Sequence, residues 1–317
     1  MSRHYAYVMR LYVAGINGMV GSAVNLEAKT QRHEVIGRSS NELDLTNRQA
    51  VFMELEKTQP DALIIAAAMV GGIGANARLP VDFLSINLQI QTNLLDAAHT
   101  SGVSRVLFLG SSCIYPKLAA QPITESALLS GELEPTNESY AIAKIAGLKL
   151  VEAYRRQFGH KWISAMPTNL YGPRDNFNLD SAHVLPALIH RFHLAHLAGK
   201  NKVEIWGDGT PLREFLHVQD LARACLVLLE KYDEPVAINV GSGQEITIGQ
   251  LASLVAKVIG FRGEISFDTD RPNGTPRKLL DNSKISNLGW KPEINLEEGI
   301  TSTYDWFVKS YEKGLIK

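Results

Sequence analysis

The chain has few cysteines, no long apolar segment and almost no net charge. With only Cys113 and Cys225 in 317 residues, no disulfide framework is predicted, and a reducing cytoplasmic location fits. No stretch approaches 18 consecutive apolar residues, so no membrane-spanning helix is predicted, and the first ten residues lack the apolar core of a signal peptide. A formal net charge of −1 favours neither nucleic acid nor an anionic membrane as partner. We also predict no metal site.

The sequence does have the pattern of an α/β protein. Short, continuously apolar segments alternate with segments whose apolar residues have helical spacing, a pattern typical of a parallel sheet covered on both faces. We therefore predict a Rossmann-like, doubly wound parallel sheet. The expected strands are residues 11–14, 34–37, 62–68, 106–109 and 163–166, and the expected helices begin near Met19 and span 82–100 and 140–158.

After Asn169 the sequence changes, with several clusters of turn-forming residues. We predict that residues 1–170 form the nucleotide-binding domain, to which the chain returns around 217–243. Residues 171–317 are expected to form mainly a smaller α+β substrate-binding domain over the carboxyl ends of the sheet. Its expected elements are helices at 183–198, 249–259 and 296–308 and a strand at 203–206, with a further strand and tight turn at 239–243.

A glycine loop lies between the first predicted strand and the first predicted helix. Gly15, Gly18 and Gly21 are spaced three apart. Glycine permits a tight turn and lets a pyrophosphate approach the N–H groups at a helix N-terminus. A glycine-rich turn without a ligand is the alternative, but the position between strand and helix favours a dinucleotide site.

The end of the second predicted strand indicates which dinucleotide binds. NAD sites usually present an acid there to the ribose 2′-hydroxyl. Residues 37–41 include no carboxylate and one guanidinium, that of Arg38, which would attract a 2′-phosphate. The sequence therefore predicts NADP(H) as the cofactor. In the alternative interpretation, Arg38 is a solvated surface residue that contacts no ligand.

Tyr140 and Lys144 are i and i+4 on a predicted helix and so share one face. The ammonium is expected to lower the phenol pKa from about 10, so that Tyr140 can protonate a ketone oxygen while a hydride reaches its carbon. Ser111, at the end of the preceding strand, can hold that oxygen. Cys113 stands two residues further on, as an acid/base group able to act on a neighbouring carbon.

These stretches resemble the extended short-chain dehydrogenase/reductases that act on nucleotide sugars. Within that family, the chain is similar to the GDP-L-fucose synthases, the 3,5-epimerase/4-reductases of GDP-4-keto-6-deoxy-D-mannose. The resemblance covers nearly the whole chain. It rests on the glycine loop, the Ser/Tyr/Lys set and residues 18–23, 70–73, 110–117, 134–138, 167–173, 213–218 and 274–281.

The resemblance gives the thiol a role. A C4 ketone acidifies the hydrogens on C3 and C5, and in this family a Cys and a His exchange those protons; Cys113 and His183 match them. Their ordinary pKa values, about 8.5 and 6.5, allow both to exchange protons near neutrality. In the alternative interpretation, Cys113 is a small packing residue and His183 is a surface residue at the start of a helix.

The resemblance also implies binding residues and a homodimer formed through the helices at 82–100 and 140–158, although packing within a single chain would leave the same apolar pattern. For a GDP-sugar substrate it implies contacts from Arg191, Trp206, Arg213 and Asn273. For the cofactor we expect contacts from Gly15, Asn17, Gly18, Met19, Val20, Gly21, Arg38, Ser39, Ser40, Asn41, Asp44, Leu45, Leu109, Gly110, Ser111, Ser112, Tyr140, Lys144, Pro167, Thr168, Asn169, Leu170 and His183.

The chain departs from the family pattern at three places. Ile16-Asn17 stands where bacterial relatives often have His-Arg, and Ser40 stands where a second arginine is common. Two contacts to a 2′-phosphate are therefore missing from their usual positions. Asn273 replaces a common Asp at the substrate.

Other functions remain open at this point. A nucleotide-sugar 4,6-dehydratase would place an acidic pair where this chain has Ser112-Cys113, and a simple 4-epimerase needs neither the thiol nor His183. An NADP sensor without enzymatic activity is expected to lose Tyr140 or Lys144, and both are present.

Overall fold

A parallel sheet of six strands forms the centre of the larger part of the molecule. The computed structural model describes residues 8–270 and 273–316. The strand order is β2-β1-β3-β4-β5-β9, and every neighbouring pair is parallel. The strands are β1 (Arg10–Ala14), β2 (Glu34–Ile36), β3 (Ala62–Ile65), β4 (Arg105–Leu109), β5 (Ile163–Pro167) and β9 (Ile238–Val240).

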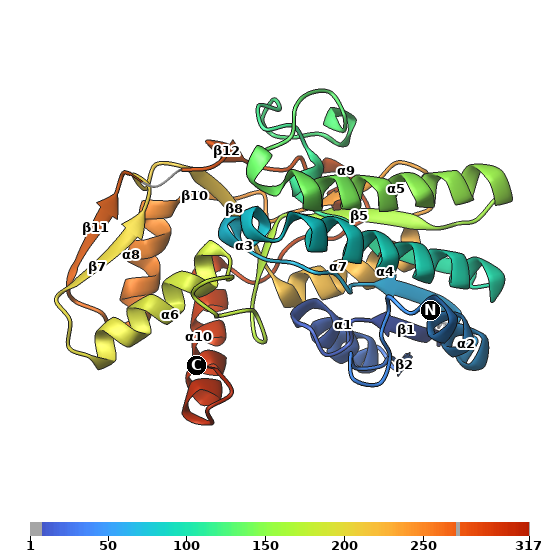
Figure 1. Ribbon diagram of the computed structural model, residues 1–317, viewed down its shortest axis with the longest axis horizontal. Helices are drawn as coiled ribbons and strands as arrows, with labels where there is room; N and C mark the ends of the chain where they lie inside the picture. Colours follow the sequence, from blue (N-terminus) through green and yellow to red (C-terminus); the bar gives the residue numbers. More distant parts are fainter. Residues whose placement is uncertain (1–7, 271–272, 317) are drawn as a thin grey trace, which may run out of the picture.

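Helices cover both faces of this sheet (Figure 1). Helices α1 (Met19–Thr30) and α7 (Val218–Lys231) pack on one face, where alternate strand residues such as Leu11 and Val13 form a core. Helices α2 (Arg48–Thr58), α4 (Pro80–Thr100) and α5 (Glu138–Phe158) cover the other face, against residues such as Tyr12 and Leu63. The alternation of strand side chains between the two cores is the reason the strands are apolar throughout.

The smaller part of the molecule consists of short strands and three helices around a third core (Figure 1). β8 pairs with β6, β10 and β12, and β7 pairs with β11. The bounds are β6 (Asn169–Tyr171), α6 (Val184–Leu197), β7 (Lys202–Trp206), β8 (Leu212–His217), β10 (Glu245–Thr247), α8 (Ile248–Ile259), β11 (Glu264–Asp268), β12 (Arg277–Lys278) and α10 (Leu296–Glu312). The remaining short helices are α3 (Ile73–Arg78), η1 (Ser112–Ile114), η2 (Glu125–Ala127), η3 (Pro135–Asn137) and α9 (Ser283–Asn287).

The predicted fold class is confirmed, with differences in detail. The strand expected at 62–68 ends at Ile65, because the chain there leaves the sheet to line a cavity. The elements that had not been predicted are α2, α3, η1, η2, η3, β6, β8, α7, β10, β11, β12 and α9. After the smaller part begins, the chain returns to the large sheet through α7 and β9, while the domain boundary near residue 170 stays a prediction. No helix in the described part of the chain is both long and apolar enough to span a bilayer.

The strand order places a ligand site. β2 and β3 lie on opposite sides of β1, so the loops that follow these strands diverge and leave a crevice at their carboxyl ends. The glycine loop after β1 opens into that crevice.

Candidate active site

A cavity of about 1110 Å³ lies at the carboxyl ends of the central strands. Its lining begins at the glycine loop, passes the ends of β2, β3, β4 and β5, and reaches α6, β7 and β8 of the smaller part. Both parts of the molecule therefore contribute to one site, large enough for a dinucleotide beside a second ligand.

The glycine loop is shaped to receive a phosphate. Gly15 has φ 86°, a left-handed conformation that favours glycine, and a Cβ there would lie 2.9 Å from the Ala67 backbone nitrogen. A Cβ on Gly21 would overlap the Gly15 carbonyl. Gly18 begins α1 with no side chain from the described residues capping the helix, so the first N–H groups can donate to an anion. These features fit the pyrophosphate of a dinucleotide.

The end of β2 is less positive than the sequence analysis indicated. Arg38 forms an ion pair with Glu54 at 2.9 Å between Nε and Oε1. Ser39 donates from its backbone N and its hydroxyl to Glu42 Oε2 at 2.8 and 2.7 Å, and these bonds lower the pKa of Glu42. An ionised carboxylate thus lies just beyond residues 37–41, and the Ser39 hydroxyl is already engaged.

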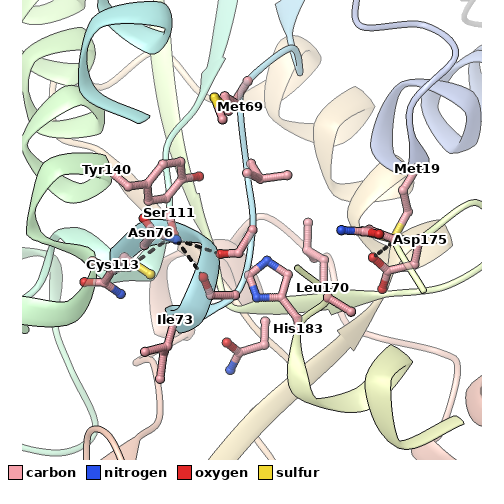
Figure 2. A pocket seen from close by; sticks show the side chains of 18 of the residues that line it. Met19, Met69, Ile73, Asn76, Ser111, Cys113, Tyr140, Leu170, Asp175 and His183 are labelled. Atoms are coloured by element: carbon pink, nitrogen blue, oxygen red, sulfur yellow. Dashed lines mark hydrogen bonds between the residues drawn. The ribbon is translucent and has the colours of Figure 1, made fainter. Parts of the chain in front are cut away.

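Ser111, Cys113 and Tyr140 gather on one side of the cavity in Figure 2, with His183 across from them. Ser111 follows β4 and caps η1, its Oγ accepting from the Cys113 backbone N at 3.2 Å. Tyr140 projects from the first turn of α5 and forms a hydrogen bond with Ser111. The strand end and the helix therefore place a hydroxyl, a phenol and a thiol together.

The predicted lowering of the Tyr140 pKa is wrong for the structure as it stands. Burial raises the pKa of Tyr140, the Cys113 thiol adds to the effect, and the Ser111 hydrogen bond opposes it. Lys144 is buried, and its Nζ donates to the Leu109 carbonyl at 2.9 Å, lying 5.9 Å from the Tyr140 ring centroid. Burial lowers the pKa of Lys144 to about 8. Tyr140 accordingly remains a neutral phenol, the form that can give up a proton.

The ammonium of Lys278 acts on both Cys113 and His183, and the sequence analysis had not assigned Lys278 to the site. Lys278 Nζ lies 3.9 Å from Cys113 Sγ. Burial lowers the pKa of His183, and the Lys278 ammonium lowers it further. His183 is also the N-cap residue of α6, where the positive end of the helix disfavours a second positive charge. The imidazole is therefore neutral near pH 7 and able to accept a proton.

The far end of the cavity presents two arginines. Arg191 lies over the ring of Trp206, with 5.4 Å from its Cζ to the ring centroid, and Trp206 itself is 53% exposed at the end of β7. Arg213 donates to the Asn273 carbonyl at 3.4 Å, and the Asn273 side chain accepts from the Asp208 N at 3.0 Å. Guanidinium groups and an indole suit a diphosphate and a flat base or sugar.

Most of the predicted site residues line this cavity. They are Gly15, Gly18, Met19, Val20, Gly21, Arg38, Ser40, Asp44, Leu45, Gly110, Ser111, Ser112, Cys113, Tyr140, Pro167, Thr168, Asn169, Leu170, His183, Arg191, Trp206, Arg213 and Asn273. Asn17, Ser39, Asn41, Leu109 and Lys144 are not part of the lining. For all of these residues, inside and outside the lining, the individual contacts to cofactor and substrate remain predictions.

Several lining residues were missed by the sequence analysis. Lys278 lies in a stretch already noted for its resemblance, but only the pairing of β12 with β8 brings it to the site. Arg174 and Asp175 lie in a turn cluster that gave no functional signal. Burial raises the pKa of Asp175 to about 7.

The fold and this site together define a class of enzyme. A glycine loop in a doubly wound sheet, with serine, tyrosine and lysine around a strand end, is the arrangement of a short-chain dehydrogenase/reductase. The chain belongs to the NAD dependent epimerase/dehydratase family, whose sequence profile matches residues 11–241.

Individual relatives are similar over nearly their full length. The chain is 53% identical to GDP-L-fucose synthase 1 of Arabidopsis thaliana, covering 95% of this chain and 94% of the relative. It is 49% identical to GDP-L-fucose synthase of Escherichia coli strain K12, covering 96% and 98%. A solved GDP-L-fucose synthetase from Naegleria fowleri bound to NADP superposes with a TM-score of 0.87 at 31% identity, covering 95% and 94%.

Proposed function

We propose that the protein converts GDP-4-keto-6-deoxy-D-mannose into GDP-L-fucose, by epimerising C3 and C5 and then reducing C4 with NADPH. The observation behind this proposal is that Cys113 and His183 line the same cavity as Ser111 and Tyr140. A reductase alone requires only the hydroxyl, the phenol and the buried lysine. The names of the relatives and the NADP in the Naegleria fowleri structure support both the substrate and the cofactor.

The epimerisation is a pair of proton exchanges. A base removes the hydrogen from the carbon beside the ketone, the electron pair moves into the carbonyl as an enolate, and an acid returns a proton to the opposite face. Cys113 and His183 lie on different elements, η1 and the start of α6, and are suited to flank a sugar ring. The depressed pKa of His183 keeps its ring neutral at the start, and the Lys278 ammonium can stabilise negative charge at Cys113 Sγ.

The reduction uses Ser111 and Tyr140, on the side of the cavity where Cys113 also lies. A nicotinamide dinucleotide held along the glycine loop would supply the hydride for C4. Ser111 orients the ketone oxygen, and Tyr140 donates its phenolic proton to that oxygen. Lys144, held against the Leu109 carbonyl, lies beneath Tyr140 and stabilises the tyrosinate left behind. The raised pKa of Tyr140 ensures that the proton is present when it is needed.

The GDP group is assigned to the far end of the cavity. Arg191 and Arg213 would neutralise the diphosphate, and the exposed Trp206 offers its indole to the base or sugar. The Asn273 side chain is engaged with Asp208, so its contribution is to hold the backbone against which Arg213 rests.

The quaternary structure and location follow as parts of the proposal. α4 and α5 pack against each other on the outer layer of the sheet, and Ile142 and Phe158 of α5 are exposed apolar side chains. A second copy of the chain would cover these side chains, so we assign the α4–α5 surface as the interface of a homodimer. Both cysteines are free thiols, in keeping with a reducing cytoplasm.

The test of the function is a direct conversion. The protein is incubated with GDP-4-keto-6-deoxy-D-mannose and NADPH, and the product is identified by chromatography and NMR. The proposal predicts loss of one NADPH for each GDP-L-fucose formed. A product with the original configuration at C3 and C5 would show a simple reductase, and no NADPH oxidation would reject the reaction altogether.

A further inference from the structure

The loop after β6 lies over the glycine loop and brings a guanidinium to it. Arg174 donates from Nη1 to the Asn17 carbonyl at 3.5 Å. Arg174 has φ 68°, a left-handed conformation that is unfavourable for a residue other than glycine. It also lines the cavity. Arg174 is therefore an exposed residue that lines a ligand cavity and has an unfavourable backbone conformation.

The contacted segment lies on the β2 side of the glycine loop. A Cβ on Gly37 would lie 2.7 Å from Ile16 Cβ, so the Ile16-Asn17 segment packs directly on the end of β2. Arg38 and Ser40, which follow Gly37, line the same cavity. A ligand group bound at the end of β2 is therefore close to the carbonyl that Arg174 reaches from the other side.

The charges at the end of β2 leave a phosphate without enough positive partners. Arg38 is paired with Glu54, and the ionised Glu42 also interacts with Arg38. One positive charge thus faces two negative charges, and Asp44 adds another carboxylate to the same cavity. By itself this arrangement would repel a 2′-phosphate.

Asp175 does not cancel the charge of Arg174. Figure 2 shows Asp175 beside Met19, at the first turn of α1, where its Oδ2 is buried. Its pKa of about 7 keeps a large fraction of the carboxyl neutral at neutral pH. Arg174 thus retains a positive charge that can act on a ligand.

We propose that Arg174 binds the 2′-phosphate of the cofactor and gives the enzyme its preference for NADPH over NADH. This inference rests on the cofactor assigned under the proposed function. The Arg174 guanidinium reaches the backbone of Asn17. It thereby brings a positive charge to a position where the Asn17 side chain has none. Its planar donors suit a phosphate dianion, and its engagement with the Asn17 carbonyl holds it in place before the cofactor binds.

The test compares Arg174→Asn with Arg32→Asn in binding titrations without sugar nucleotide. Asparagine tolerates the left-handed conformation, so the first variant removes the guanidinium without straining the loop. Arg32 is an exposed arginine with a similar φ of 66° outside the cavity, which makes the second variant a matched control. The probes are NADPH, NADH, adenosine 2′,5′-bisphosphate and AMP.

We expect Arg174→Asn to weaken NADPH and adenosine 2′,5′-bisphosphate about tenfold, the loss of one charged hydrogen bond. NADH and AMP should bind as before, Arg174→Lys should retain part of the preference, and Arg32→Asn should match wild type. Equal weakening of NADPH and NADH would place Arg174 at the pyrophosphate and overturn the inference, as would an unchanged ratio. If wild type itself does not prefer NADPH, the cofactor assignment fails as well, whereas the sugar reaction is judged separately by product analysis.

Discussion

Tyr140 and Lys144 lie one helical turn apart on α5, and burial shifts their pKa values in opposite directions. The pKa of the phenol rises and that of the ammonium falls to about 8, so burial favours the uncharged form of each. For a reduction this is a useful resting state, because the acid is protonated and the lysine is ready to stabilise the tyrosinate as it forms.

Tyr140→Phe removes the proton donor while keeping the ring in place. We expect the hydride-transfer rate to fall about 10²- to 10⁴-fold. NADPH affinity should be nearly unchanged, because the residues proposed to bind the phosphates lie elsewhere. Single-turnover NADPH oxidation measures the rate, and a fluorescence titration measures the affinity. A rate within a few-fold of wild type would remove Tyr140 from the mechanism.

Lys144 also gives the stability a pH dependence. The unfolded chain, with a pKa of 10.5, binds more protons than the folded protein, with a pKa of about 8, so Lys144 makes folded stability rise with pH across that window. Relative to Lys144→Met, wild type should gain about 2 kcal/mol in free energy of unfolding between pH 7 and pH 9.5. Urea denaturation at the two pH values tests this. A difference independent of pH would show that the ammonium is not desolvated.

Single residues differ in how far the sequence could predict them. Ser111, Cys113, Tyr140 and Lys144 were predictable because each lies a short, fixed distance from a strand end or along one helix. Lys278 was not, because 165 residues separate it from Cys113 and only the β12–β8 pairing joins them. The same limit hid Glu54, whose position beside Arg38 depends on the packing of α2.

At the scale of elements, β8 connects the loops around the cavity through one buried carboxylate. Glu214 has no exposed surface. Its Oε1 accepts from the Gly243 N at 2.7 Å and its Oε2 from the Leu280 N at 3.1 Å. Its backbone carbonyl accepts from Asn169 Nδ2 at 2.8 Å. β8 therefore ties the turn after β9 and the segment after β12 to the floor of the site.

Glu214→Gln should loosen this connection. The amide nitrogen would face a backbone N–H donor, leaving a buried group unsatisfied at a cost of about 1 to 3 kcal/mol in free energy of unfolding. Urea denaturation measures the change, and Glu204→Gln, at an exposed position on β7, is the matched control. Equal stability of the two variants would mean that the Glu214 hydrogen bonds contribute little.

At the scale of the whole molecule, the proposed cofactor and substrate sites share one cavity because two parts of the chain meet over the ends of the parallel strands. The alternation of apolar strands and amphipathic helices made the large sheet predictable. The smaller part was predicted only in outline, because its strands are as short as two residues and have little periodicity of their own. Its pairing depends on contacts with β8 rather than on local sequence.

The proposed homodimer gives a prediction at this scale. Wild type should have twice the chain mass of 34.9 kDa by light scattering coupled to size exclusion. Ile142→Glu would place a charge in the apolar face of α5 and should yield the single-chain mass. A wild-type mass of one chain, or a dimer unaffected by the substitution, would reject the α4–α5 surface as the interface.

The central claim is that one cavity both exchanges protons beside the ketone and reduces it. Incubation with GDP-4-keto-6-deoxy-D-mannose and NADPH in deuterated water tests both halves at once, with the product analysed by NMR. The account predicts GDP-L-fucose with deuterium at C3 and at C5, and loss of most of that exchange in Cys113→Ser while NADPH still binds. Oxidation of NADPH with no deuterium at either carbon would contradict it.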